Sequence, residues 1–217
     1  HSGFGHVFAG GPAPVLAYGI SAGETRIMFD VPTVGHGGHG GHDEHDMKAY
    51  LEALPQPLRL EVERAMSTQT PLRSANYSVL PEMVVKGRLV CVGDAGGCCH
   101  PVTATGLTAC ARDAVRLRDT LRETGGDIPG ALQRYANLRE RPQRTRMVGA
   151  DVLYEVLKAA TPEMSLLRQG LLRYWKQSPR GRAATMALLS THDDRLSAVV
   201  REYAQVCRHA LPELVRS

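Results

Sequence analysis

Residues 86–121 read KGRLVCVGDAGGCCHPVTATGLTACARDAVRLRDTL, and this stretch predicts a strand, a loop and a helix around which the rest of the chain is organised. Leu89–Val92 is a short apolar run of the kind found in strands buried on both faces, and Gly93-Asp94 ends it. A helix is expected to begin near Thr105 or Gly106. Apolar residues recur from there at helical spacing, at Leu107, Cys110, Ala111, Ala114, Val115, Leu117 and Leu121.

The connection between this strand and this helix has features of a ligand site. The first backbone N–H groups of a helix lack intrahelical acceptors and lie at the positive end of the helix dipole. Asp94 can accept hydrogen bonds from sugar-like hydroxyls, while Gly93 and Gly106 let the backbone approach a ligand closely. An ordinary strand-to-helix connection with an aspartate in its turn fits the same residues, so both interpretations stay open at this point.

The same stretch resembles a known motif. Gly93-Asp94-Ala95, His100-Pro101, Gly106-Leu107-Thr108 and Asp113-Ala114 resemble the second flavin-binding motif of the class A flavoprotein monooxygenases, most closely that of the squalene epoxidases. In that family the aspartate holds the ribitol of FAD, and the helix start faces the pyrimidine edge of the flavin. The resemblance thus implies an FAD site formed by Gly93, Asp94, Ala95, Pro101, Gly106, Leu107 and Thr108. The implied chemistry is sound, because a reduced flavin carries negative charge at that edge.

The similarity extends from about residue 12 to residue 190. Residues 13–18 and 21–30 look like a strand pair of the substrate domain, and several stretches between 153 and 190 look like carboxyl-terminal helices. The resemblance implies mixed structure, α+β or α/β, that forms part of a class A flavoprotein monooxygenase fold. We expect three segments: substrate-domain strands with a His/Gly-rich loop and short helices (1–85), the completion of the FAD-binding domain (86–124), and a carboxyl-terminal helical region (125–217).

The implied function is that of an FAD-dependent monooxygenase that inserts one oxygen atom of dioxygen into an apolar alkene, squalene first, through a flavin C4a-hydroperoxide. NAD(P)H or a partner reductase would supply the electrons. No catalytic side chain is named, because the hard chemistry belongs to the cofactor. His100 is interpreted as structural, since no proton for it to abstract is identified.

An apolar stripe between Met164 and Trp175 has three interpretations. Helix packing is the default one. The resemblance suggests instead that Tyr174 and Trp175 contact the substrate. The third is contact with a bilayer face, with Arg168, Arg173 and Lys176 at the headgroups.

The sequence contains no Gly-x-Gly-x-x-Gly dinucleotide fingerprint. We therefore expect the chain to be the carboxyl-terminal part of a longer enzyme, which its start without methionine also favours. Two alternatives are a non-catalytic binding or membrane-surface module, and a related hydroxylase of an aromatic or quinone precursor.

Charge and cysteine content bound the setting of the protein. The formal charge of +4 hides an asymmetry, because residues 1–138 carry 12 basic and 14 acidic side chains and residues 139–217 carry 14 and 8. The basic part fits solvated helix faces or an anionic membrane surface, but no aromatic-interleaved basic patch indicates nucleic acid. Five cysteines in no framework spacing favour a reducing compartment. A cytoplasmic protein with peripheral membrane contact is expected.

The remaining elements follow from local patterns. Residues 15–20 and 25–31 predict a hairpin, two short helices are expected within 47–66, and a further strand within 74–80. A helix from Ala131 is expected to be interrupted near Pro142, and Thr161 is expected to cap another helix. His36, His39, His42 and His45 suggest zinc or nickel ligands, but the glycines between them leave the ligands unorganised, so no metal is expected.

Overall fold

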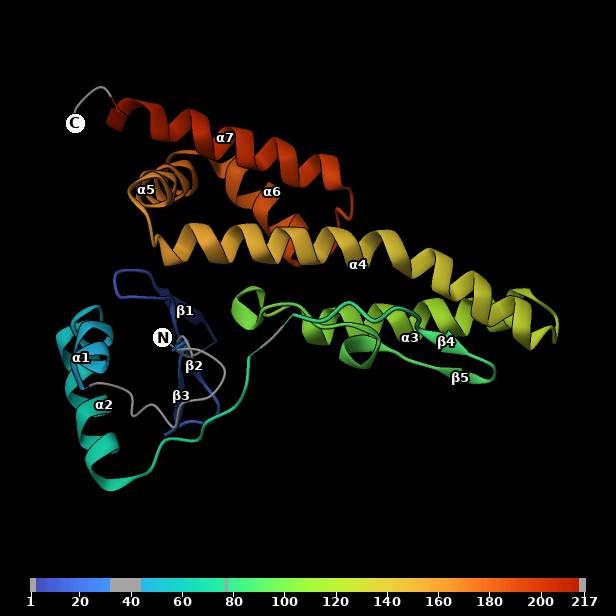
Figure 1. Ribbon diagram of the computed structural model, residues 1–217, viewed down its shortest axis with the longest axis horizontal. Helices are drawn as coiled ribbons and strands as arrows, with labels where there is room; N and C mark the ends of the chain where they lie inside the picture. The colour runs from blue at the N-terminus through green and yellow to red at the C-terminus, as the bar shows by residue number, and fades with distance from the viewer. Residues whose placement is uncertain (1–2, 32–43, 77, 215–217) are drawn as a thin grey trace. The chain divides into compact units, whose positions relative to one another are not determined.

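The computed structural model describes residues 3–31, 44–76 and 78–214, which fold as an α+β protein (Figure 1). The chain divides into two compact units. The first comprises the chain up to Ala75 together with Glu155–Ser165, and the second comprises Asn76–Tyr154 and Leu166–Ser217. The division into three segments expected from the sequence stays a prediction.

The first unit contains an antiparallel sheet of three strands in the order β1-β2-β3, formed by Gly5–Phe8, Val15–Gly19 and Thr25–Phe29. The predicted hairpin is confirmed by β2 and β3, in which Ala17 lies opposite Ile27. Strand β1 pairs with the other edge of β2. The inward-facing positions of β2, Val15 and Ala17, are buried, as the two-residue period of a strand requires.

Two helices complete this unit, α1 (Glu44–Glu52) and α2 (Gln56–Thr68), and they confirm the two short helices predicted around Pro55 and Pro57. Apolar residues from this helical segment pack against strand β2 and the residues before it. The resulting core consists of Ala13, Val15, Tyr50, Leu54 and Val62. The glycine- and histidine-rich loop with His36, His39 and His42 lies outside the described residues, as does the side chain of His45. Among the residues that are described, no group of three or more potential ligands could hold a metal.

The second unit opens with a small hairpin of β4 (Val85–Lys86) and β5 (Leu89–Val90), which turns at Gly87 with a φ of +60°. The prediction of a strand over Leu89–Val92 that is buried on both faces is wrong for this chain: the strand ends at Val90, and Leu89 is 67% exposed. Within the described part of the chain, β5 pairs only with β4. The strand predicted within 74–80 is also wrong, because the described residues there form a single bridge between Val79 and Cys98.

Five helices make up most of the remaining chain. They are α3 (Gly106–Glu123), α4 (Ile128–Lys158), α5 (Pro162–Gln177), α6 (Pro179–Leu189) and α7 (Leu196–Leu214). Helix α3 begins where the sequence predicts. Thr161 accepts a hydrogen bond from the Met164 N–H and confirms the predicted cap. In Figure 1, α3 runs beside the first half of α4, and the ion pair between Arg139 and Asp113 joins the two helices.

Helix α4 passes through Pro142 without a break, so the predicted interruption is wrong. Proline removes one backbone hydrogen bond and crowds the preceding turn. Side chains on either side of Pro142 offset that cost, because Arg139 and Arg146 both bind backbone carbonyls of a neighbouring loop. Tertiary contacts therefore override the local preference of the proline.

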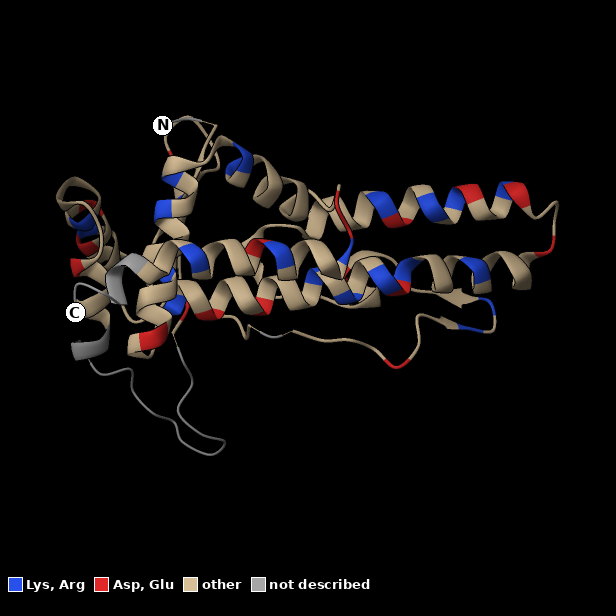
Figure 2. Ribbon diagram, turned by 90° about the horizontal axis from the view of Figure 1, so that it is seen from above, with Lys and Arg blue, Asp and Glu red and all other residues tan. Residues whose placement is uncertain are grey.

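Charged residues of both signs are interspersed along the helices (Figure 2). Several form pairs within one helix, such as Arg144 with Glu140 at 2.9 Å. None of the helices in the described ranges is both long enough and apolar enough to cross a membrane.

Candidate cofactor site

The loop from Val92 to Thr105 connects β5 to α3 and is built on glycines at positions that other residues rarely adopt. Gly93 has a φ of +57° and Gly97 a φ of +120°, both in the region that strains a side chain. A short 3₁₀ turn covers Gly93–Gly96, and a second covers Pro101–Thr103. The Gly93 N–H donates to a carboxylate oxygen of Asp113 at 2.9 Å, which ties the loop start to the middle of α3.

The carboxylate of Asp94 lies against the start of α3. A Cβ atom placed on Gly106 would be 3.2 Å from the Oδ2 atom and 3.5 Å from the Oδ1 atom of Asp94. Only a residue without a side chain leaves this approach uncrowded. Asp94 is exposed, so a ligand can reach its carboxylate.

The first turn of α3 is open as well. Thr105 precedes the helix, and within the described residues no side chain caps this end by a hydrogen bond. The next residue after Gly106, Leu107, is 89% exposed. The first N–H groups of the helix therefore retain their capacity to stabilise negative charge on a ligand.

The other predicted residues surround this point. Ala95 and Pro101 are exposed in the two 3₁₀ turns, and Thr108 is half-buried on α3. His100 accepts a hydrogen bond from the Val102 N–H at 3.2 Å. Its other ring nitrogen lies 2.8 Å from the Asn76 amide nitrogen, and its ring stacks on Tyr154 with centroids 4.0 Å apart. These contacts are compatible with the structural interpretation of His100, which stays a prediction.

Side chains on one face of α4 donate hydrogen bonds to the backbone carbonyls of the loop and of the residue just before it. The Tyr135 hydroxyl donates to the Cys91 carbonyl at 2.9 Å, and the Arg146 guanidinium donates to the Gly97 carbonyl at 2.7 Å. Between them, Arg139 donates to the Gly93 carbonyl at 2.8 Å and also to the Gly96 carbonyl. Three side chains spaced along one side of the helix thus satisfy the carbonyl of Cys91, just before the loop, and three carbonyls within it.

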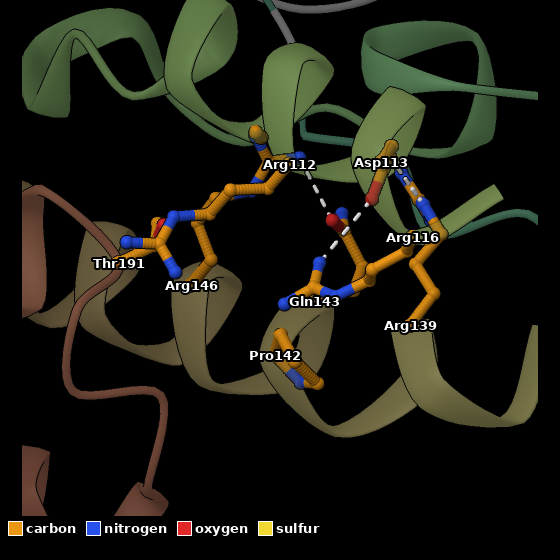
Figure 3. A pocket seen from close by; sticks show the side chains of 9 residues that line it. Arg112, Asp113, Arg116, Arg139, Pro142, Gln143, Arg146 and Thr191 are labelled. Carbon is orange, nitrogen blue, oxygen red and sulfur yellow. Dashed lines mark hydrogen bonds and ion pairs between the residues drawn. The ribbon is translucent and has the colours of Figure 1, made fainter. Parts of the chain in front are cut away.

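Asp113 completes this arrangement from α3 (Figure 3). Its carboxylate accepts from the Arg139 Nε atom at 2.7 Å, and both side chains are almost fully buried. Gly96 makes room for the guanidinium, because a Cβ there would lie 2.9 Å from the central carbon of that group. A buried pair of this kind is stable only when its remaining hydrogen-bonding atoms are also satisfied. Here the carbonyls of Gly93 and Gly96 accept hydrogen bonds from the remaining N–H groups of Arg139.

The environment of this cluster also acts on Tyr135. Burial raises the pKa of Tyr135 to about 12, the charge of Asp113 acts in the same direction, and Arg139 opposes them. The phenol is therefore protonated at neutral pH and can donate to the Cys91 carbonyl.

Sequence reasoning missed the supporting residues. It included Asp113 in the motif without a role and interpreted Arg139 and Arg146 as members of a basic helix. The available signal was their spacing: Tyr135, Arg139, Gln143 and Arg146 recur every three or four residues and therefore share one helical face. A polar face is typical of solvent exposure, so its burial against glycine-rich backbone was not predicted.

Tyr174 and Trp175, the candidate substrate residues, lie on α5 with contacts to α6 and α7. The buried Tyr174 hydroxyl donates to Glu202 at 2.8 Å, and its ring packs so closely on Gly181 that a Cβ there would lie 2.5 Å from a ring carbon. The Trp175 ring N–H donates to the Thr185 hydroxyl at 2.9 Å. These contacts fit helix packing, the default interpretation of the stripe.

Comparison with known proteins identifies the family. The family model for squalene epoxidase matches residues 1–217. The protein named squalene epoxidase 2, mitochondrial, from Arabidopsis thaliana is 31% identical over 96% of this chain and 38% of its own length. Squalene epoxidase of Schizosaccharomyces pombe is 25% identical over 99% of this chain and 49% of its length, and mouse squalene monooxygenase is 28% identical over 92% and 35%. The chain belongs to the squalene epoxidase family, and it spans less than half the length of each of these relatives.

Proposed function

We propose that this chain is part of an FAD-dependent squalene monooxygenase, and that it supplies the residues at the ribitol and pyrimidine end of the cofactor. The observation that carries the proposal is the position of the Asp94 carboxylate beside Gly106 at the uncapped start of α3. The names of the relatives support the substrate class, because each is called a squalene epoxidase or a squalene monooxygenase.

The residues present fit this part of a flavin. An exposed carboxylate can accept hydrogen bonds from ribitol hydroxyls, and charge-assisted bonds of this kind are strong. The amides of Gly106 and Leu107 would face the pyrimidine edge, where negative charge develops on reduction. The role of Arg139, Arg146 and Asp113 is to fix the loop so that these groups are already in place before the cofactor binds.

The chemistry of the reaction would come from the cofactor. When bound, FAD would activate dioxygen, one oxygen atom would enter the alkene, and the other would leave as water after taking up two protons from the solvent and two electrons from NAD(P)H or a reductase. The adenosine and pyrophosphate of FAD would be held by residues outside this sequence, in the remainder of a class A flavoprotein fold. The exposed apolar residues of β5 and α3 support an incomplete domain, because Leu89, Leu107 and Val115 are 67%, 89% and 46% exposed.

The substrate and membrane contacts belong to the same proposal. Tyr174 and Trp175 would line the apolar substrate site, and a peripheral contact with a membrane would give a cytoplasmic enzyme access to its substrate. Replacing Trp175 with alanine would then raise KM for squalene more than it lowers kcat. If the variant instead lost activity only in proportion to its loss of folded protein, with KM for squalene unchanged, Trp175 would serve helix packing alone.

The proposal is tested by the reaction itself. The full-length protein would be supplied with FAD, NADPH, a reductase, squalene and dioxygen labelled with heavy oxygen. We expect an epoxide whose oxygen atom carries the heavy label, and we expect product only when FAD is present. Turnover of an aromatic or quinone substrate in place of squalene would reject the substrate class, and absence of any bound flavin would reject the enzyme.

A further inference from the structure

A small cavity lies between α3 and α4 (Figure 3). It is next to the side chains of Arg139 and Arg146, which bind the Gly93–Gly97 loop. Its volume is about 20 Å³, which is room for roughly one water-sized group. Side chains from the two helices point toward one another around it. The lining residues that matter for the argument are Arg112, Asp113, Arg116, Arg139, Gln143 and Arg146.

The cavity has an excess of positive charge. Four arginines line it, and among the described residues in its wall Asp113 is the single carboxylate. Asp113 already accepts from the Gly93 N–H, from Arg139 at 2.7 Å and from Arg116 at 3.4 Å. Arg146 is only 8% exposed, so a second cation is buried here without a carboxylate in the wall to balance it. An uncompensated buried charge is strongly destabilising.

The cavity wall also carries donors without acceptors. The Arg146 Nη2 atom donates to the Gly97 carbonyl and to the Gln143 side-chain oxygen. Its Nε and Nη1 atoms are buried and have no hydrogen-bond partner in the described part of the chain, and the same holds for the hydroxyl of Thr191 in the cavity wall. Buried donors in folded proteins are nearly always satisfied, so an acceptor is expected at this place.

We propose that this cavity binds one small inorganic anion of the size of chloride. A single anion would neutralise the unbalanced charge and would also accept hydrogen bonds from the unpartnered donors. A water molecule would accept the hydrogen bonds but leave the charge unbalanced. The volume is too small for a phosphate or a sulfate. The anion would fix the Arg146 guanidinium, and through it the Gly97 carbonyl, so the stability of the loop would depend on halide.

Thermal unfolding of the full-length protein tests this proposal. Chloride or bromide would be compared with gluconate, an anion too large for the cavity, at constant ionic strength. At about tenfold excess over Kd we expect a saturable rise in Tm of roughly 2–5 °C in the halides relative to gluconate. Equal Tm values in chloride and gluconate would overturn the proposal.

Variants on the two helices localise the effect. Arg146→Gln and Arg112→Gln should abolish the halide-dependent rise, and Arg112→Gln serves if the buried variant fails to fold. The matched control is Arg144→Gln, which removes an exposed arginine from the same helix and should keep the full rise. The same rise in Arg112→Gln as in the unchanged protein would contradict the site.

A crystal of the full-length protein grown in bromide gives a direct position. We expect an anomalous peak between α3 and α4, next to Arg146. Density for water alone at that place would overturn the proposal. Neither measurement involves flavin, so the anion site stands or falls separately from the proposed function.

Discussion

The guanidinium of Arg139 lies 2.7 Å from the carboxylate of Asp113, although the two residues belong to different helices and both are almost fully buried. The same guanidinium binds the carbonyls of Gly93 and Gly96, on either side of Asp94. Arg139 thus fixes the backbone around Asp94, the residue proposed to hold the cofactor. This pair links the stability of the helices to the geometry of the candidate site.

Replacing Arg139 with lysine should lower the free energy of unfolding by about 1.5–3 kcal/mol, the usual cost of losing hydrogen bonds to a charged group in a buried site. Lysine keeps the charge, but its single ammonium cannot reach Asp113, the Gly93 carbonyl and the Gly96 carbonyl together. Denaturant-induced unfolding of the full-length protein measures the change. The control is Arg134→Lys, whose partner Glu123 is exposed, and it should cost no more than about 1 kcal/mol. Equal costs for the two variants would mean that the buried pair has no special role.

Replacing Gly96 with alanine should destabilise the protein by about 1–3 kcal/mol, as overpacking of a filled interior does. The new methyl group would lie 2.9 Å from the Arg139 guanidinium carbon, so one of the two must move. Gly149→Ala in α4 is the contrasting change, because among the described residues its Cβ would meet Val199 alone, at an ordinary 3.8 Å. Alanine is favoured over glycine inside a helix by about 0.8–1 kcal/mol, so this variant should gain stability. Stabilisation by both changes would disprove the close approach of Arg139.

Alkaline conditions should destabilise the protein through two tyrosines. Burial, more than any other cause, raises the pKa of Tyr135 and of Tyr174 to about 12, from an ordinary value of 10.0. Their contribution is fully present below pH 10 and is lost as the pH rises toward 12, because the unfolded chain releases these protons first. Unfolding free energies measured across this range should fall with pH. The double variant Tyr135→Phe/Tyr174→Phe should show a shallower fall, and an unchanged slope would contradict the raised pKa values.

Sequence patterns predicted the elements whose signals are local. The start of α3 near Gly106, the hairpin of β2 and β3, and the cap at Thr161 follow from helical spacing, alternation and capping chemistry. The loop with Asp94 was recognised through its motif. These features depend on residues close together in the chain.

Features that depend on distant residues were not predicted. The burial of Arg139 against Asp113 joins positions 26 residues apart, and no pattern in α4 announces that its polar face meets backbone carbonyls. Leu89 illustrates the opposite error, in which an exposed residue was predicted to be buried. An apolar run becomes buried only where other residues cover it, and among the described residues Leu89 stays 67% exposed. The passage of α4 through Pro142 has a similar origin, since long-range hydrogen bonds from Arg139 and Arg146 outweigh the local cost.

The affinity of the full-length protein for FAD, measured for the Asp94→Ala variant, tests the central claim most directly. Loss of a charged hydrogen-bond acceptor costs about 1.5–3 kcal/mol, so Kd should rise roughly 10- to 150-fold. Asp119→Ala is the control, because it removes a carboxylate near the far end of α3, where Asp119 pairs with its neighbour Arg118. It should leave Kd unchanged. A Kd for Asp94→Ala equal to that of the unchanged protein would contradict the assignment of this loop and helix start as the flavin site.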